Sequence, residues 1–324
     1  MKYKQLGRTG LTVSTISLGT LTVGTELNEK DSTNLIKNSL DAGINFLDTS
    51  DTYGAGKSEE FVGKAIKGER DAVLLATKVG RRPGPRDFGT LSRKSIMMAV
   101  EASLRRLDTD YIDLYYAHVP DYLTPLEETL RAFDDLVHQG KVRYIGCSNF
   151  YAWRVCKSLW LSERHNLARF ECVQPPYNLL ARDMEYELVP LCASEGLGIC
   201  VFNPLAGELL TGRHTFGAPP AEGRLTLKSA GPRYLKRYWS EANFKAVDRF
   251  KQIAHDHGRT MAQFAMAWIL NNPAITSVIS GYTSIAQLDD NVQAMELVLS
   301  EEELAACDNV WEMFRPPRHM YAMQ

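Results

Sequence analysis

Three ionisable side chains mark the ends of successive apolar segments in this sequence. Asp48, Lys78 and His118 each stand at or near the C-terminal end of such a segment, and Tyr53 follows shortly after Asp48. Burying an ionisable side chain at the end of a strand costs free energy unless the group is paired. Taken singly, each residue has an ordinary structural interpretation, as a loop cap, a surface lysine or a hydrogen-bonded buried histidine. Four such residues on neighbouring segments favour one shared site instead.

Together these residue types suit the reduction of a carbonyl group. When hydride attacks the carbonyl carbon, the oxygen needs a proton donor, and a tyrosine hydroxyl can supply the proton. The unperturbed pKa of tyrosine is about 10, but a neighbouring lysine cation favours the phenolate and lowers that pKa. A carboxylate holds such a lysine charged and in place, and a neutral histidine can orient the substrate oxygen by a hydrogen bond.

Eight apolar segments of strand length alternate with helical patterns along the chain. They span residues 16–19, 44–49, 72–78, 111–118, 142–148, 170–174, 198–202 and 275–281. Most are nearly continuous apolar runs rich in β-branched or aromatic residues, which is typical of parallel strands buried on both faces. Two of the intervening helices carry start signals: Ser92 as an N-cap, and Thr124 as a capping residue with Pro125 in the first helical position.

Eight strand–helix units in one unbroken alternation predict an α/β fold, a single (β/α)8 TIM barrel that occupies residues 1–324 as one domain. No G-x-G-x-x-G motif follows the first strand, which disfavours an open dinucleotide-binding sheet. Residues 3–6 and 13–15, around Arg8-Thr9-Gly10, predict a β-hairpin that caps the barrel floor.

The segments expected to bind the substrate are loop-like. Residues 80–90 and 214–240 follow the third and seventh strands, at the face where barrel enzymes bind substrates, and residues 151–160 and 311–324 are also interpreted as loops. Within them, residues 231–237 predict a solvated loop. Their aromatic side chains could form an apolar or sugar-stacking wall, or they could simply anchor the loops, and the sequence leaves this choice open. These side chains are Phe88, Tyr151, Trp153, Tyr234, Tyr238 and Trp239.

From Leu6-Gly7-Arg8-Thr9-Gly10 to Asn291 the sequence resembles the aldo-keto reductase superfamily. The resemblance is carried by Asp48-Thr49-Ser50-Asp51-Thr52-Tyr53-Gly54, by Thr77-Lys78 and by His118. It implies that Tyr53 is the general acid, that Lys78 and Asp48 tune it, and that His118 positions the carbonyl. It also implies a small-molecule carbonyl or alcohol substrate and a nicotinamide cofactor.

The resemblance places the cofactor contacts on several strand ends. Ser148, Asn149 and Gln174 resemble the residues that hold the nicotinamide carboxamide. Phe202 resembles the residue that stacks on the nicotinamide, although tyrosine or tryptophan is more usual there, and Asn203 stands where serine is common. The complete expected set of cofactor contacts is Gly19, Thr20, Leu21, Asp48, Ser148, Asn149, Gln174, Phe202, Asn203, Pro204, Leu205, Gly207, Leu210, Gly281, Thr283, Gln287 and Asn291.

The identity of the nucleotide depends on the adenosine end. Ser280-Gly281-Tyr282-Thr283-Ser284 resembles the loop that leads into a phosphate-binding helix N-terminus, with Ser284 at or near the cap. Thr283 occupies a position where many relatives carry an arginine for the 2′-phosphate, and a lysine or arginine within residues 213–236 could replace it. The sequence favours NADP, with NAD as the alternative.

Several classes of function are disfavoured. The net charge is −2 and no basic stripe is present, which argues against nucleic-acid binding, and no apolar stretch approaches the length of a membrane span. His255 and His257 have no third ligand nearby, so no metal site is predicted. Residues 54–58 resemble part of a phosphate loop, but Asp51 stands where its first glycine belongs. Scattered cysteines and the absence of a signal peptide predict reduced thiols and a cytoplasmic location.

Two alternatives to a turnover enzyme stay open. One is a cofactor-sensing regulatory subunit similar to the β subunits of voltage-gated potassium channels. Those subunits share the expected fold and the quartet of Asp48, Tyr53, Lys78 and His118. The absence of an N-terminal segment before the hairpin argues against it. The other is a barrel that binds cofactor without turnover, which the intact quartet disfavours. The sequence does not indicate the substrate or the oligomeric state.

Overall fold

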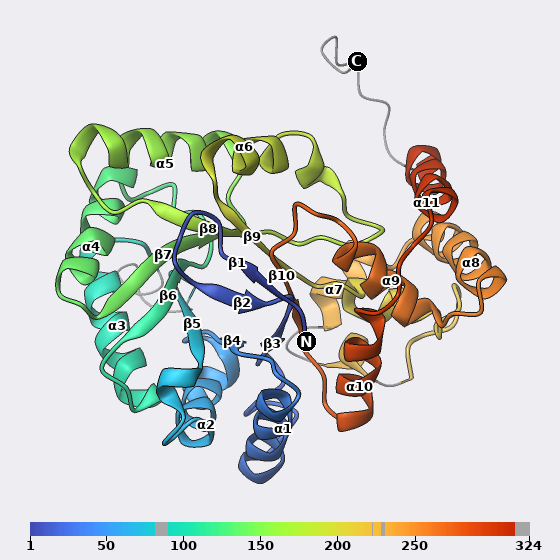
Figure 1. The fold of residues 1–324 in the computed structure, drawn as a ribbon, viewed down its shortest axis with the longest axis horizontal. Coiled ribbons are helices and arrows are strands. Elements are labelled where there is room, and N and C mark those ends of the chain that lie inside the picture. The colour runs from blue at the N-terminus through green and yellow to red at the C-terminus, as the bar shows by residue number, and fades with distance from the viewer. Residues whose placement is uncertain (82–89, 222, 228–230, 315–324) are drawn as a thin grey trace. The chain divides into compact units, whose positions relative to one another are not determined.

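A computed structural model describes residues 1–81, 90–221, 223–227 and 231–314 (Figure 1). The chain forms two compact units. The first comprises residues 1–176, 183–202 and 272–292, and the second comprises residues 177–182 and 203–271 together with the chain from residue 293 onward. The expectation of one domain over residues 1–324 stays a prediction.

The first unit is a closed barrel of parallel strands. Its eight strands pair in chain order and the last closes on the first: β3 (Ile16–Gly19), β4 (Phe46–Asp48), β5 (Leu74–Val79), β6 (Ile112–Ala117), β7 (Val142–Ser148), β8 (Phe170–Gln174), β9 (Gly198–Phe202) and β10 (Ser277–Ser280). Each segment predicted as a strand overlaps one of them. The predicted (β/α)8 barrel is therefore confirmed.

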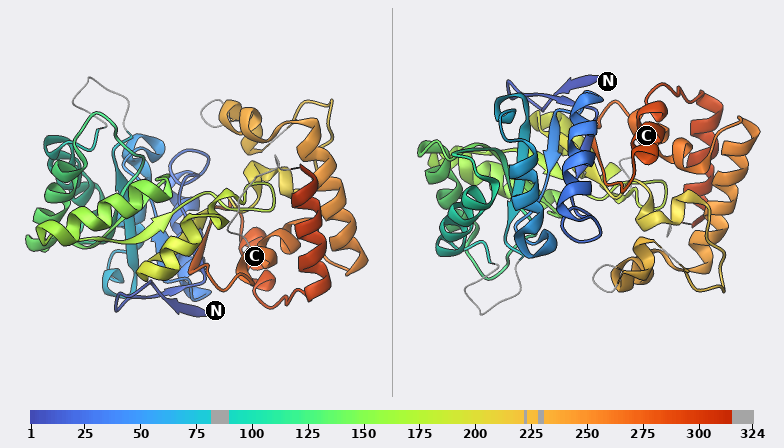
Figure 2. Two further views of the ribbon diagram at one scale, coloured as in Figure 1. Left: turned by 90° about the horizontal axis from the view of Figure 1, so that it is seen from above. Right: turned by 90° about the horizontal axis from the view of Figure 1, so that it is seen from below.

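Helices surround these strands (Figures 1 and 2). They are α1 (Glu29–Asp41), α2 (Lys57–Ala65), α3 (Arg93–Leu107), α4 (Leu126–His138), α5 (Ala152–His165), α6 (Leu188–Glu195) and α10 (Ile285–Ala294). The Ser92 hydroxyl accepts the Ser95 N–H at the start of α3, so the predicted cap is confirmed. The signal predicted for α4 is wrong. Pro125 itself occupies the capping position, because the Thr124 hydroxyl donates to Asp121 Oδ2 at 2.7 Å instead.

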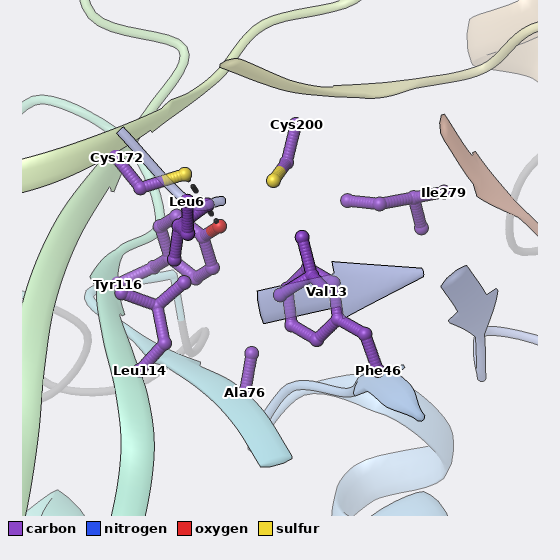
Figure 3. Close-up of a cluster of buried hydrophobic side chains, with 9 residues drawn as sticks. All are labelled: Leu6, Val13, Phe46, Ala76, Leu114, Tyr116, Cys172, Cys200 and Ile279. Atoms are coloured by element: carbon purple, nitrogen blue, oxygen red, sulfur yellow. Dashed lines mark hydrogen bonds between the residues drawn. The ribbon is translucent and has the colours of Figure 1, made fainter. Parts of the chain in front are cut away.

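The N-terminal hairpin consists of β1 (Tyr3–Gln5) and β2 (Thr12–Ser14), which pair antiparallel at one end of the barrel (Figure 2). Leu6 and Val13 are fully buried and belong to the apolar cluster inside the barrel. Figure 3 shows the whole cluster, which consists of Leu6, Val13, Phe46, Ala76, Leu114, Tyr116, Cys172, Cys200 and Ile279. A Cβ on Gly7 would lie 2.5 Å from the Gly198 nitrogen, so the hairpin turn approaches β9 closely. The expected hairpin cap is confirmed.

The second unit is helical. It contains the short 3₁₀ turns η4 (Ala206–Thr211) and η5 (Arg224–Thr226) and the helices α7 (Gly231–Tyr238), α8 (Glu241–Asp256), α9 (Met261–Leu270) and α11 (Glu301–Phe314). An extended buried face on α8, α9 and α11 packs these helices together, with Phe250, Phe264 and Val310 among its members.

Three loop predictions need correction. Residues 231–237 form most of α7 rather than a solvated loop, because Gly231, Tyr234 and Tyr238 recur at helical spacing on its inner side while Arg233 and Arg237 are exposed. Residues 152–160 belong to α5, whose buried face begins with Arg154 and Val155. In the tail, residues 311–314 are the last turn of α11. Phe88, most of the expected loop at residues 80–90, and residues 315–324 lie outside the described residues.

Candidate active site

Lys78 and Asp48 form a buried ion pair at the C-terminal ends of β5 and β4. Lys78 Nζ donates to Asp48 Oδ1, and to the Thr49 carbonyl oxygen at 2.7 Å. The Lys78 side chain is 0% exposed and that of Asp48 is 2% exposed. Gln174 Nε2 at the end of β8 donates to Asp48 Oδ2 at 2.7 Å, so both carboxylate oxygens have partners.

The two charges support each other. Burial favours the neutral amine of Lys78, but the adjacent Asp48 carboxylate and Tyr53 hydroxyl outweigh it and raise the pKa of Lys78. Burial raises the pKa of Asp48, although the attraction of Lys78 and the hydrogen bond from Gln174 oppose that change. Lys78 is therefore a cation throughout the neutral range.

Tyr53 opens the 3₁₀ turn η1 (Tyr53–Gly56) that leads into α2. Lys78 Nζ lies 5.1 Å from the centre of the Tyr53 ring, and a hydrogen bond with Tyr53 contributes to the raised pKa of Lys78. The turn requires glycine: Gly54 has a φ of +56°, and a Cβ there would lie 2.8 Å from the Gly24 carbonyl oxygen. This turn holds the tyrosine hydroxyl beside the lysine cation.

His118 is 3% exposed and lies edge-on to Tyr53, with ring centres 6.2 Å apart. Its Nδ1 is 3.1 Å from Ser50 Oγ and its Nε2 is 3.4 Å from Arg81 Nη1. A guanidinium can only donate, so Nε2 accepts here and Nδ1–H donates to Ser50. The structure thus brings Asp48, Tyr53, Lys78 and His118 together.

Sequence reasoning gave no role to Ser50 or Arg81, the two residues that bracket His118. Ser50 is part of the motif that follows β4, and Arg81 comes three residues after Lys78 at the end of β5. Their signal was the same one that identified the quartet, a polar side chain at the C-terminal end of a barrel strand.

Three of the predicted cofactor residues are hydrogen-bonded to the quartet or to each other. Asn149 Nδ2 donates to the His118 carbonyl oxygen and to Ser148 Oγ, both at 2.9 Å, and Ser148 Oγ donates to the Gln174 carbonyl oxygen at 2.8 Å. Asn149 has a φ of +62°, a conformation that asparagine tolerates better than most residues. In the described part of the chain, no residue donates to Asn149 Oδ1 or to Gln174 Oε1.

The end of β3 supplies the next predicted contacts, Gly19, Thr20 and Leu21. Thr20 is fully buried, and its hydroxyl donates to the Asp48 carbonyl oxygen at 3.0 Å. A Cβ on Gly19 would lie 2.8 Å from Ile279 Cγ2 on β10, so only glycine fits at this position without a shift.

At the end of β10 the predicted adenosine loop leads into α10. The Gln287 N–H donates to Ser284 Oγ at 3.4 Å, which confirms Ser284 as a cap, and Gln287 Oε1 accepts the Thr283 N–H at 2.9 Å. This reciprocal arrangement resembles a capping box and occupies one of the donors that an anion would use. Asn291 is nearly buried and donates to Ser280 Oγ at 3.0 Å. Gly281 and Thr283 are exposed.

The remaining predicted contacts follow Phe202, the last residue of β9. They belong to the second unit and lie in or next to η4: Asn203, Pro204, Leu205, Gly207 and Leu210. Asn203 and Gly207 have φ values of +64° and +65°, and Leu210 is fully buried.

Within the described residues, no group of three histidine, cysteine, aspartate or glutamate side chains could hold a metal ion. In the same part of the chain, no helix is both long and apolar enough to cross a membrane.

A closed parallel barrel with a buried lysine–aspartate pair at its C-terminal strand ends, beside a histidine and a tyrosine that follow such ends, is an α/β-barrel enzyme architecture. The aldo/keto reductase family profile matches residues 15–312. The chain belongs to the aldo/keto reductase family, and this membership places it with the oxidoreductases.

Relatives within this family cover nearly the whole chain. A protein named probable voltage-gated potassium channel subunit beta, from Arabidopsis thaliana, is 37% identical over 92% of both chains. An uncharacterized oxidoreductase, YrpG of Bacillus subtilis, is 38% identical over 96% of both chains. The versiconal hemiacetal acetate reductase of Aspergillus parasiticus is 35% identical over 94% of this chain and 95% of its own.

Proposed function

We propose that this protein is a nicotinamide-nucleotide-dependent oxidoreductase that reduces an aldehyde, ketone or sugar-derived carbonyl, or catalyses the reverse oxidation of an alcohol. One observation carries the proposal: the buried Lys78–Asp48 pair lies against Tyr53. A buried ion pair is a weak source of stability, whereas a fixed cation beside a phenol is useful for proton transfer.

In this mechanism Tyr53 gives its proton to the carbonyl oxygen. The Lys78 cation stabilises the phenolate that remains, and Asp48 keeps Lys78 charged and in place. The expected cofactor supplies the hydride when it is bound. Because the stabilising charge is already fixed before the reaction, little reorganisation is needed in the transition state.

His118 orients the carbonyl oxygen in this proposal. A carbonyl oxygen at Nε2 takes the place of Arg81 and requires the tautomer with a proton on Nε2. Ser50 permits this change, because its hydroxyl can either accept from Nδ1–H or donate to Nδ1. Arg81 is then released toward the substrate.

The side chains near the quartet fit a nicotinamide. Asn149 Oδ1 and Gln174 Oε1 are acceptors that match the NH₂ donors of a carboxamide, and Ser148 lies beside both residues. Ser148, Asn149 and Gln174 are therefore proposed to hold the carboxamide, and Phe202 to stack on the ring. NADP is the proposed nucleotide, with NAD as the alternative.

Replacing Tyr53 by phenylalanine tests the proposal directly. Tyr53→Phe should keep the fold and the nucleotide affinity but lower the rate constant for carbonyl reduction by ~10²–10⁴, because only the proton donor is lost. The measurement is single-turnover reduction of the best substrate from a panel of aldehydes, ketones and sugars, assayed with NADPH and NADH. Tyr111→Phe, immediately before β6 and outside the site, is the control. A Tyr53→Phe rate above half of the wild-type rate would refute the role of Tyr53.

A regulatory role is the second candidate, favoured by the potassium channel β subunits among the relatives. Both functions require nucleotide binding, so turnover separates them. A wild-type protein that binds NADPH but reduces none of the panel substrates would favour the regulatory role.

A further inference from the structure

The turn that follows β9 has an unusual backbone conformation. Asn203, Ala206, Gly207 and Glu208 have φ values of +64°, +50°, +65° and +85°. Three of these four residues carry a side chain, and such residues rarely adopt a left-handed conformation unless the surrounding structure imposes it. Interactions with neighbouring residues must therefore hold this turn.

The Asn203 side chain is the first of these interactions. Its Oδ1 accepts the Gly207 N–H at 2.8 Å, across the strained turn, and its Nδ2 donates to the Tyr238 hydroxyl at 2.7 Å. A backbone N–H can only donate, so the orientation of the amide is determined. Asn203 is 7% exposed, so these hydrogen bonds are largely protected from water.

Asn178 makes the second set of interactions from a separate segment. Its Oδ1 accepts the Leu180 N–H at 2.9 Å, and its Nδ2 donates to the Asn203 carbonyl oxygen at 2.9 Å and to the Tyr238 hydroxyl at 3.3 Å. The Tyr238 hydroxyl thus receives hydrogen bonds from two buried amides. Burial raises the pKa of Tyr238, so this hydroxyl stays neutral and the network does not change with pH in the neutral range.

Helix α7 supports the same turn at a second point. Tyr234, one helical turn before Tyr238, packs over Gly207, where an added Cβ would lie 2.5 Å from Tyr234 Cδ1. Residues four apart lie on one face of a helix. That face of α7 therefore contacts the turn with the Tyr234 ring and the Tyr238 hydroxyl.

We propose that Tyr238 is a positioning residue for the nicotinamide nucleotide, and that it acts by holding Asn203 and the turn up to Thr211 in the conformation that receives the cofactor. The inference rests on the proposed function, because it takes Asn203, Gly207 and Leu210 as cofactor contacts. It also explains why this chain has Asn203 at a position where serine is common among members of the family. A serine hydroxyl there is too short to span the Gly207 N–H and the Tyr238 hydroxyl, so Asn203 and Tyr238 act as a pair.

Tyr238→Phe tests this role because it removes only the hydroxyl, which accepts from Asn203 Nδ2 and from Asn178 Nδ2, while Asn178 keeps its hydrogen bond to the Asn203 carbonyl oxygen. We expect the dissociation constant for NADPH, measured on the full chain by quenching of intrinsic fluorescence, to rise by about tenfold. The rate of reduction at saturating nucleotide should stay within about twofold of the wild-type rate, because the quartet is untouched. Tyr234→Phe keeps the ring over Gly207 and is the matched control, with no expected change.

If Tyr238→Phe folds poorly, Asn203→Ser is the alternative test, because it leaves Tyr238 intact and should by itself also raise the dissociation constant for NADPH. If the two side chains act as one network, the double variant should bind NADPH no more weakly than the weaker single variant. Tyr238→Phe with a lower melting temperature but an unchanged dissociation constant would overturn the inference, since the hydroxyl would then be merely structural. Failure of the wild-type protein to bind NADPH or NADH would instead refute the proposed function.

Discussion

Lys78 has no exposed side-chain surface, yet its neighbours keep it charged. Its Nζ donates to Asp48 and to the Thr49 carbonyl oxygen, and Gln174 holds the second oxygen of Asp48. An unpaired cation at this depth would lose its proton, because desolvation favours the neutral amine. The carboxylate is therefore as necessary to the proposed chemistry as the lysine.

Lys78→Met should reduce turnover strongly and shift its pH dependence. Reduction requires protonated Tyr53, so the wild-type rate falls as the pH rises and the phenolate forms. Without the cation that favours the phenolate, this fall should move to higher pH. Steady-state rates at saturating substrate over a pH series provide the measurement, and Lys64→Met, which removes an exposed partner of Glu29, is the control. An unchanged pH profile in Lys78→Met would refute the role of the lysine.

The raised pKa of Lys78 also affects stability. Because this pKa is higher in the folded chain, the contribution of Lys78 is fully present below the unfolded value of about 10.4. It is lost as the pH rises through the folded pKa. Lys78 therefore favours the folded state throughout the neutral range, whereas the raised pKa of Asp48 acts in the opposite direction there.

At the scale of elements, α2 links η1, the turn that contains Tyr53, to β5, the strand that contains Lys78. Glu59 on α2 is 0% exposed, accepts from the Thr77 hydroxyl at 2.6 Å and from Arg106 Nε at 2.7 Å. Thr77 precedes Lys78 on β5, and Arg106 lies near the end of α3. One carboxylate thus links the helix that follows Tyr53 to the strand that carries Lys78.

Glu59→Ala should destabilise the fold by about 3–5 kcal/mol, because Arg106 loses the carboxylate with which it forms an ion pair. Urea unfolding followed by circular dichroism measures the change. Glu60→Ala, the exposed neighbour on the same helix, should change the free energy of unfolding by less than about 0.5 kcal/mol. Equal effects of the two substitutions would show that the buried interaction is unimportant.

For the whole molecule, binding of the proposed nucleotide should change the stability of the folded chain. A ligand that binds only the folded state raises the melting temperature, by an amount that depends on its affinity. The melting temperature with each nucleotide therefore reports nucleotide preference for the intact chain.

We expect NADPH to bind more tightly than NADH by no more than about 1–2 kcal/mol, roughly 5- to 30-fold. Thr283 offers one hydroxyl in place of an arginine fork, and Gln287 already occupies its N–H. Thr283→Arg should tighten NADPH binding and leave NADH binding nearly unchanged, as measured by fluorescence titration. Thr109→Arg, remote from α10, is the control. A wild-type preference above a thousandfold would show that another basic residue binds the 2′-phosphate.

The sequence by itself determined the barrel, the hairpin and the four residues Asp48, Tyr53, Lys78 and His118 as one group. These features follow from local patterns: apolar runs, capping residues, and polar side chains at strand ends, which parallel strands bring to a single face of the barrel. Such patterns can be recognised in short stretches of the chain without knowledge of how those stretches pack.

Only the tertiary structure decided the helix at α7, the capping position of Pro125, the residues that bracket His118 and the network around Tyr238. A loop interpretation of residues 231–237 was reasonable because the many charged residues there hide the spacing of Tyr234 and Tyr238. Most of these features depend on partners distant in the sequence, such as Asn178 for Tyr238 or Arg81 for His118. Whether a polar side chain faces solvent or a buried partner is decided by packing between such segments, because burial is what makes an unmade hydrogen bond costly.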